Sequence, residues 1–263
     1  MNEFFYDINS TLIAAALLVS LGLVIELGYR VGRARQDRVD DASRAHINGL
    51  QSSILGILAL LLGFTFSLAL QRFDSRSEAV VQEANAIGTA YLRAQLLPAA
   101  FRSDAQALLH RYVDVRVQTG AHHLADRAEL DALLAQATQL QTALWQQARR
   151  VAELEPDALA PFLYIESLNT LIDNFSTRDA ALSRHVPEVV LFLLYGTLLM
   201  AGVIVGFACG VAGHRPSMAS YVMVALIVVL VFIILDLDRP RRGLIQVSQK
   251  SLVDLQTSVR ADK

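Results

Sequence analysis

Residues 47–70 read INGLQSSILGILALLLGFTFSLAL and contain no charged side chain. A helix needs about 20 apolar residues to cross roughly 30 Å of hydrocarbon. Three further uncharged runs of 18 or more residues have the same character: 8–25, 189–213 and 216–235. A buried helix in a water-soluble core does not account for four such runs. The sequence therefore predicts four transmembrane helices.

The composition agrees with a membrane location. Apolar residues make up 54% of the chain and charged residues only 18%, and the mean hydropathy is +0.40. The net charge of −2 provides no basic field for nucleic acid, which we exclude as a partner. The single cysteine, Cys209, lies in an apolar run and cannot form an intramolecular disulfide. The lipid bilayer is the partner that this composition predicts.

Beyond the second run the sequence becomes amphipathic and keeps a helical period. Apolar residues recur at spacings of four and three, which defines one helix face: Val80, Ala84, Ile87, Tyr91 and Ala94. No helix breaker occurs before Pro98. We therefore expect the second span to leave the membrane and continue as one helix to about Leu97.

Three more amphipathic helices are expected before the third span. They run from about Ser103 to Thr119, where Gly120 is placed to end the helix, from about residue 130 to near Pro156, and from Asp157 towards the third span. Ser103 and Asp157 are expected to cap their helices, and Pro187 to mark a kink or the membrane boundary. The predicted fold class is an all-α membrane protein whose soluble four-helix bundle consists of extensions of spans two and three and two intervening helices.

The domain organisation follows from these segments. We expect a transmembrane hairpin over residues 1–70, the soluble bundle over 71–186, a second transmembrane hairpin over 187–236, and a charged juxtamembrane motif with an amphipathic tail over 237–263. The apolar periodicity of the tail indicates that it packs on the bundle, on the membrane surface or on a neighbouring subunit.

The arginines on the two sides of the membrane predict opposite orientations of the protein in it. The loop between the first two spans carries five of them, whereas residues 1–10 carry no basic residue. By the positive-inside rule this places the N-terminus and the soluble domain outside the cell. Arg72, Arg76, Arg239 and Lys250 lie on the opposite side of the membrane and favour the reverse arrangement.

Small residues mark two helix faces for close packing. In lipid, helices associate where small side chains let their backbones approach. The third span has Gly202, Gly206 and Gly210 at four-residue spacing, and the second has Gly63 within a stripe of glycine, alanine and serine. These four glycines are the candidate packing positions, within one subunit or between subunits.

Charged residues near the ends of the spans are candidates for the mouths of an ion path. The set comprises Glu26, Arg72, Arg76, Asp236, Asp238, Arg239, Arg241 and Arg242. An ionisable residue within a span is a functional candidate because its burial is costly. Two simpler interpretations stay open. Glu26 lies four residues before Arg30 and can pair with it, and the cluster from Asp236 onwards can be a topological anchor.

No motif of an enzyme or a cofactor site occurs in the sequence. The six histidines have no metal-ligand spacing with carboxylates or thiols, and no nucleophile elbow, zinc-protease or phosphate-loop motif is present. We therefore predict no metal, no cofactor and no catalytic activity.

Two stretches resemble a known family. LLGFTFSLALQRFDSR (61–76), followed by EANAIGTAY (83–91), is similar to bacterial membrane proteins described as bestrophin-like, and DLDRPRRG (236–243) with VSQ (247–249) is the second signature. The resemblance covers most of the chain outside residues 98–160. It implies a multi-pass protein of the bacterial inner membrane.

A more distant resemblance leads to the bestrophins, which are pentameric ion channels with a hydrophobic neck on their second membrane helix. It implies that Gly56, Leu60 and Phe64 face a central axis, although Gly56 departs from the bulky neck pattern. It also implies a homo-oligomer, transport of small inorganic ions, and a cytoplasmic soluble domain. The alternative is a non-conducting, membrane-anchored structural or signalling module whose helical bundle binds a partner.

Overall fold

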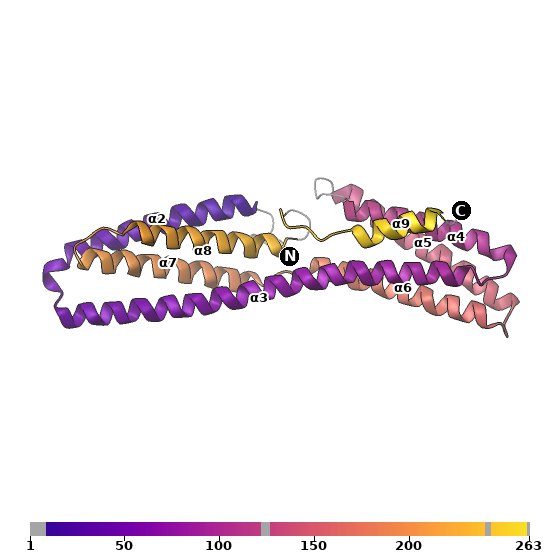
Figure 1. Cartoon of the computed structure of the whole chain (residues 1–263), viewed down its shortest axis with the longest axis horizontal. Helices are drawn as coiled ribbons and strands as arrows, with labels where there is room; N and C mark the ends of the chain where they lie inside the picture. Colours follow the sequence, from indigo (N-terminus) through magenta and orange to yellow (C-terminus); the bar gives the residue numbers. More distant parts are fainter. Residues whose placement is uncertain (1–8, 122–126, 240–242, 262–263) are drawn as a thin grey trace. The chain divides into compact units, whose positions relative to one another are not determined.

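The computed structural model describes residues 9–121, 127–239 and 243–261, and within these ranges every regular element is helical. The elements are α2 (Ser10–Ala34), η1 (Gln36–Arg38), α3 (Asp41–Ala94), α4 (Ala99–Ala121), α5 (Arg127–Leu154), α6 (Leu159–Ser183), α7 (Glu188–Val211), α8 (Met218–Leu237) and α9 (Lys250–Ala261) (Figure 1). The fold is thus all-α, as the sequence predicts.

Four helical stretches are long and apolar enough to cross a membrane: Ser10–Ala34, Asp41–Ala94, Leu159–Val211, which includes α6 and α7, and Met218–Leu237. Only 22% to 39% of the residues in their most apolar windows are buried inside the chain. Helices of a water-soluble core would hide most of such residues from solvent. The apolar windows of these helices are therefore suited to a membrane, and the prediction of a four-span membrane protein is confirmed.

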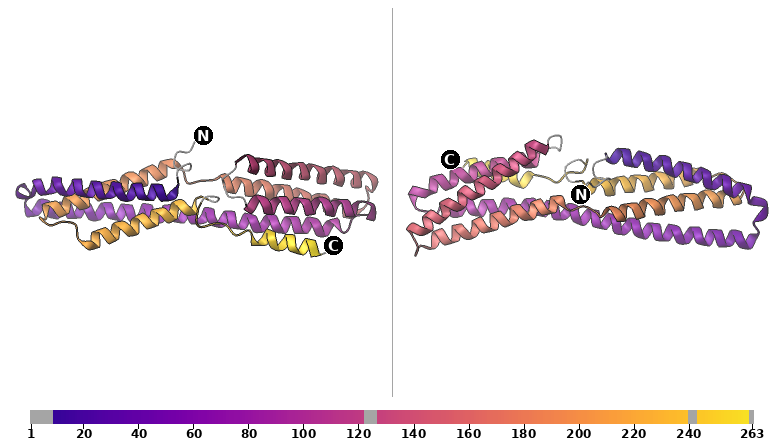
Figure 2. Two further views of the ribbon diagram at one scale, coloured as in Figure 1. Left: turned by 90° about the horizontal axis from the view of Figure 1, so that it is seen from above. Right: turned by 180° about the vertical axis from the view of Figure 1, so that it is seen from behind.

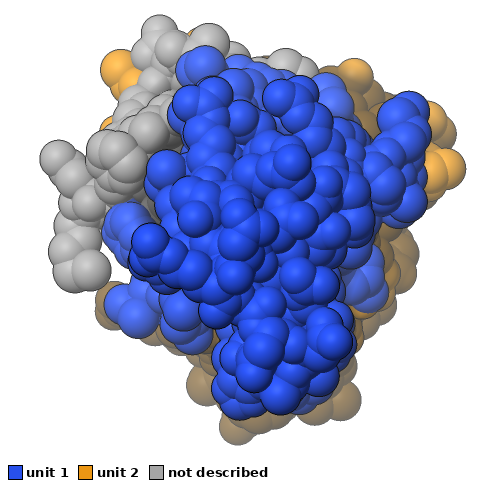
Figure 3. Space-filling model, turned by 90° about the vertical axis from the view of Figure 1, so that its left-hand side faces the viewer, with its two compact units in different colours: residues 1–72, 185–239, 243–245 blue, residues 73–184, 240–242, 246–263 orange. Residues whose placement is uncertain are grey.

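The chain forms two compact units, coloured separately in Figure 3. Unit 1 contains α2, the first part of α3, α7 and α8, and unit 2 contains the remainder of α3 with α4, α5, α6 and α9. The chain passes from unit 1 to unit 2 between Arg72 and Phe73 and returns between Arg184 and His185.

In unit 1, α2 packs directly against α7 along a seam of glycines. A Cβ atom on Gly206 would overlap the carbonyl oxygen of Ile25, and one on Gly210 would overlap that of Tyr29. On the α2 side of the seam, a Cβ atom on Gly28 would overlap the carbonyl oxygen of Val203 in the same way. The two backbones touch because no side chain separates them.

The partner of the α7 glycines is a feature that the sequence analysis did not identify. It singled out the second span, α3, as the other glycine-lined helix, whereas α2 provides the facing glycines Gly28 and Gly32. Gly202 also faces α2, where its Cβ would lie 2.9 Å from a methyl group of Val24. Figures 1 and 2 show α2, α7 and α8 running alongside one another.

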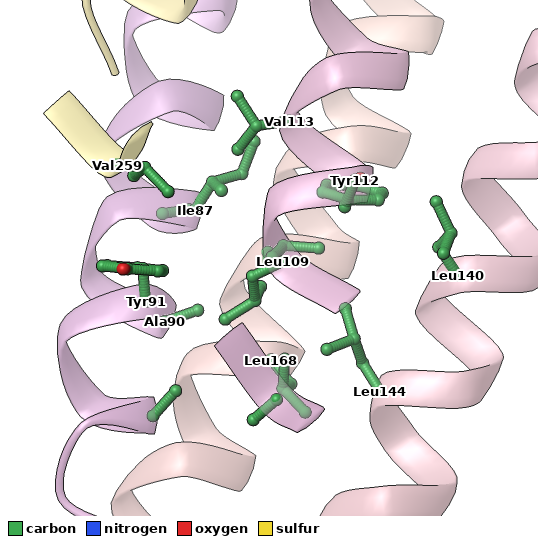
Figure 4. Close-up of a cluster of buried hydrophobic side chains, with 14 of the residues drawn as sticks. Ile87, Ala90, Tyr91, Leu109, Tyr112, Val113, Leu140, Leu144, Leu168 and Val259 are labelled. Atoms are coloured by element: carbon green, nitrogen blue, oxygen red, sulfur yellow. The ribbon is translucent and has the colours of Figure 1, made fainter. Parts of the chain in front are cut away.

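Unit 2 is a helical bundle with a continuous apolar core. Residues from α3, α4, α5 and α6 interlock in it, including Ile87, Leu109, Leu144 and Leu168, each at most 1% exposed (Figure 4). The edge of the Tyr91 ring meets the ring of His110 with 5.4 Å between ring centroids. The three-four spacing seen in the sequence therefore corresponds to the buried faces of these helices.

The C-terminal tail packs on this bundle. Helix α9 buries Leu252 completely and exposes only 4% of Val259, and both belong to the same core. On the polar side of α9, Gln256 and Arg260 donate hydrogen bonds of 2.6 and 2.7 Å to the Asp114 carboxylate of α4. Of the three locations expected for the tail, the structure shows the bundle.

Several helix ends differ from those expected. Helix α4 begins at Ala99 rather than Ser103, because the carbonyl of Pro98 already accepts the N–H groups of Phe101 and Arg102. Helix α6 begins at Leu159, and no side chain caps it, so the predicted cap by Asp157 is wrong. The break at Pro187 does lie between α6 and α7.

The glycine seam gives a first prediction. Gly206→Ala forces α2 and α7 apart and lowers the free energy of unfolding by about 1–3 kcal/mol, the usual cost of overpacking. The measurement is the thermal unfolding midpoint of the purified protein in detergent. Gly196→Ala on the same helix is the control, since nothing lies within 4 Å of its added Cβ. Equal midpoints for the two variants would contradict the seam.

Candidate functional site

Helix α3 has two unlike sides within unit 1. Leu58, Leu62 and Ala69 are buried against the unit. On the opposite side, at the 3.6-residue helical period, Leu60 and Phe64 remain 59% and 62% exposed. The single chain therefore leaves an uncovered face on the helix that carries the proposed axis residues.

Part of this uncovered surface is a stripe of small and hydroxyl residues around two large apolar ones, which we term the α3 stripe. Its members are Gly49, Ser53, Gly56, Leu60, Gly63, Phe64 and Ser67. A Cβ added at Gly49, Gly56 or Gly63 would have no neighbour within 4 Å. Among the described helices of the chain none packs at Gly63, and its assignment as a packing position stays a prediction about a second copy.

Glu26 forms the ion pair that its spacing allows. Its carboxylate accepts a hydrogen bond of 2.8 Å from Nε of Arg30, one turn later on α2. Both side chains lie on the surface of the chain, 44% and 74% exposed.

The two aspartates at the end of the fourth span, Asp236 in the last turn of α8 and Asp238 just after it, point into the protein and accept hydrogen bonds from backbone groups. The carboxylate of Asp236 accepts the N–H groups of Leu244 and Ile245 at 3.0 and 2.8 Å. The carboxylate of Asp238 accepts the N–H of Val186 at 2.7 Å, just before α7. Both side chains are buried, so within one chain they hold the segments that flank α7 and α8 together.

The arginines of the predicted mouths are also partly enclosed. Arg239 donates a hydrogen bond of 3.0 Å to the hydroxyl of Ser10. Arg76 is 1% exposed and donates to the carbonyls of Ala181 and Arg184 at the end of α6, where a cation is favourable.

The remaining arginines of the charged set are Arg72, Arg241 and Arg242. Arg72 is half-buried at the end of unit 1. Arg241 and Arg242 lie outside the described residues.

Unit 2 contains a buried charge network that the sequence analysis missed. The fully buried carboxylate of Glu83 on α3 accepts from Nε of Arg116 at 2.6 Å and also from Arg178 on α6. Arg178 in turn donates to Oε1 of Gln249 at 2.7 Å. The Arg116 guanidinium lies over the Phe175 ring, 4.6 Å from its centroid. Three distant parts of the sequence meet at one carboxylate.

Burial changes the acid–base behaviour of this network. It lowers the pKa of the Arg178 guanidinium, an effect that Glu83 opposes. Burial also raises the pKa of the neighbouring Tyr112 phenol, with a further contribution from Glu83. The Tyr112 hydroxyl accepts a hydrogen bond of 2.9 Å from Gln141. Tyr112 therefore stays neutral and adds no negative charge to the core.

The sequence did contain one signal for the network. Glu83 opens the EANAIGTAY signature and Gln249 closes the VSQ signature, and Arg178 binds both. The two stretches that carried the resemblance are therefore joined in space. A charged residue within an otherwise apolar helix period, as Glu83 is, would have marked the site.

Two grooves lined by both polar and apolar atoms lie between α3 and α6 in unit 2, with volumes of about 420 and 460 Å³. They share Gln82, and serine, threonine and asparagine side chains line much of both. In the described part of the chain no three histidine, cysteine, aspartate or glutamate side chains come together as a metal site.

These features define a multi-pass helical membrane protein with a bundle that its second span enters directly. The comparison with protein families makes the class specific: a model of the bestrophin-like domain matches residues 14–252. The chain belongs to the bestrophin-like family. Among curated proteins, none matches the chain.

Solved structures share the fold at low sequence identity. Three variants of a bacterial bestrophin homolog from Klebsiella pneumoniae superpose with TM-scores of 0.66, 0.66 and 0.64 at 15% identity. The matches cover 93%, 94% and 92% of this chain and 98%, 98% and 99% of those chains. At this identity the likeness concerns the fold alone.

The buried network gives a second prediction. Glu83→Gln leaves two buried guanidiniums without their counter-charge and lowers the free energy of unfolding by about 3–5 kcal/mol. Chemical denaturation in detergent measures this loss. The matched control is Glu166→Gln, which removes the surface partner of Arg93 and costs less than about 1 kcal/mol. Equal losses in the free energy of unfolding for the two variants would contradict the role of Glu83 as the counter-charge of the buried arginines.

Proposed function

We propose that this protein forms a homo-oligomeric ion channel in the bacterial inner membrane, with α3 around the central axis. The observation that carries the proposal is the α3 stripe, which unit 1 leaves uncovered. A face directed to lipid has no need of glycine and serine. Small residues and hydroxyls instead suit close contact between copies and a path that admits water.

Membership of the bestrophin-like family supports this proposal. The resemblance to the bestrophins implies five copies around the axis. Gly56, Leu60 and Phe64 then lie one turn apart along the path. Rings of Leu60 and Phe64 would form an apolar constriction, which gates by losing water, while Gly56 leaves the path wide at its own level.

The charged residues have a limited part in the proposal. Glu26 is the member of the set that stays at the surface of unit 1 with its partner Arg30, and we propose that it contributes to one mouth. Asp236, Asp238 and Arg239 are engaged within the chain, and we propose that they anchor the ends of the spans. Small inorganic ions are the proposed substrates, and unit 2 is the proposed water-exposed domain.

Filling the stripe tests this function. Gly56→Leu adds a third apolar ring to the path and is expected to reduce ion flux several-fold, whereas Phe64→Ala removes a ring and raises it several-fold. The measurement is flux through purified protein in liposomes. Gly56 has open space around its Cβ within the chain, so the added side chain does not disturb the subunit.

Two control variants test whether a change in flux comes from the α3 stripe or from any substitution in the membrane helices. Gly196→Leu on α7 also meets open space, and Leu226→Ala on α8 truncates a surface side chain that is 66% exposed. Both are expected to leave flux unchanged. A monomeric particle without flux, or an oligomer whose centre is closed by packed lipid, would overturn the channel and favour the membrane-anchored module.

A further inference from the structure

The core of unit 2 contains more positive than negative charge. Arg116 and Arg178 are only 2% and 3% exposed, and the one carboxylate that binds them, Glu83, is 0% exposed. Two guanidiniums around one carboxylate leave one positive charge in excess. A buried charge without a counter-charge is strongly destabilising.

The same two arginines have donors left over. Glu83 occupies the edge of Arg116 formed by Nε and Nη2, and the Nη1 atom of Arg116 is buried with no hydrogen-bond acceptor among the described residues. Arg178 directs its two terminal nitrogens to Glu83 and Gln249, and its Nε is likewise buried without an acceptor. Buried donors of this kind are rare in native proteins.

None of the described residues removes this excess charge. Arginine does not lose its proton in proteins. The neighbouring groups Tyr112, Gln141 and Phe175 are neutral, and in the described ranges Glu83 is the one carboxylate in contact with either guanidinium. Water can accept the hydrogen bonds but cannot neutralise the charge.

We infer that the bundle core binds one small monovalent inorganic anion of the halide class, held by Nη1 of Arg116 beside Arg178. A single negative charge matches the single excess positive charge. A small ion is required because the surroundings are closely packed side chains, with the Phe175 ring lying against Arg116. The anion is a structural component of unit 2, and the inference does not rest on the proposed channel.

Exchange of anions at constant ionic strength tests the site. The full-length protein in detergent is heated in sodium chloride or in sodium gluconate, whose anion is too large to enter. The unfolding midpoint is expected to lie about 5 °C higher in chloride, because a ligand stabilises the state that binds it. Arg116→Met leaves the neutral Glu83–Arg178 pair and is expected to abolish this difference.

Two controls make the result specific. Arg93→Met removes an arginine that binds the surface of α6, and Phe64→Ala alters the α3 stripe; both are expected to keep the full chloride effect. Loss of the effect in Phe64→Ala would locate the anion in the pore and overturn the inference. An equal midpoint in both salts for the wild-type protein would overturn it as well.

A direct measurement covers the case in which Arg116→Met does not fold. Crystals of the wild-type protein grown in bromide are expected to show anomalous scattering within contact distance of the Arg116 guanidinium. Density for bromide elsewhere, with none beside Arg116, would overturn the inference.

Discussion

Inside a bilayer no water is available to hydrogen-bond the polypeptide backbone, and this constraint governs the rest of the structure. Each span is therefore a complete helix, and irregular backbone is confined to the span ends. There, side chains take the place of water: Asp236 and Asp238 accept free N–H groups, and Arg76 donates to free carbonyls. Charges that look like an ion-selecting mouth in the sequence serve first to complete the backbone of these turns.

The lipid surroundings also explain how the helices of unit 1 hold together. Lipid is as apolar as leucine, so burial of apolar surface gives little attraction between spans, and close approach has to provide it. The glycine seam lets α2 and α7 touch backbone to backbone. Helix α3, which lacks such a seam within the chain, keeps one side free. Tight packing of α2 on α7 thus leaves one side of α3 uncovered within the chain.

The number of spans and the long continuation of α3 could be predicted, because both depend on local runs of apolar residues. Partners distant in the sequence could not. The α7 glycines predicted close packing, but the sequence did not show that Gly28 of α2 would face them. No local pattern connects Glu83 with Arg178, 95 residues away. Helix starts were misplaced at Ser103 and Asp157 because a capping preference is weaker than the turn set by Pro98 or the packing of α6. Whether the predicted pore and mouth residues act as such depends on a second copy, which one sequence does not describe.

The contact between Arg178 and Gln249 has a consequence for how the bundle is completed. The bundle begins at residue 73, yet one acceptor for its buried arginine and two core side chains, Leu252 and Val259, come from the segment that follows the fourth span. Without the segment that follows α8, the bundle lacks these parts of its core. The core is therefore complete only with α9, which follows all four spans in the sequence.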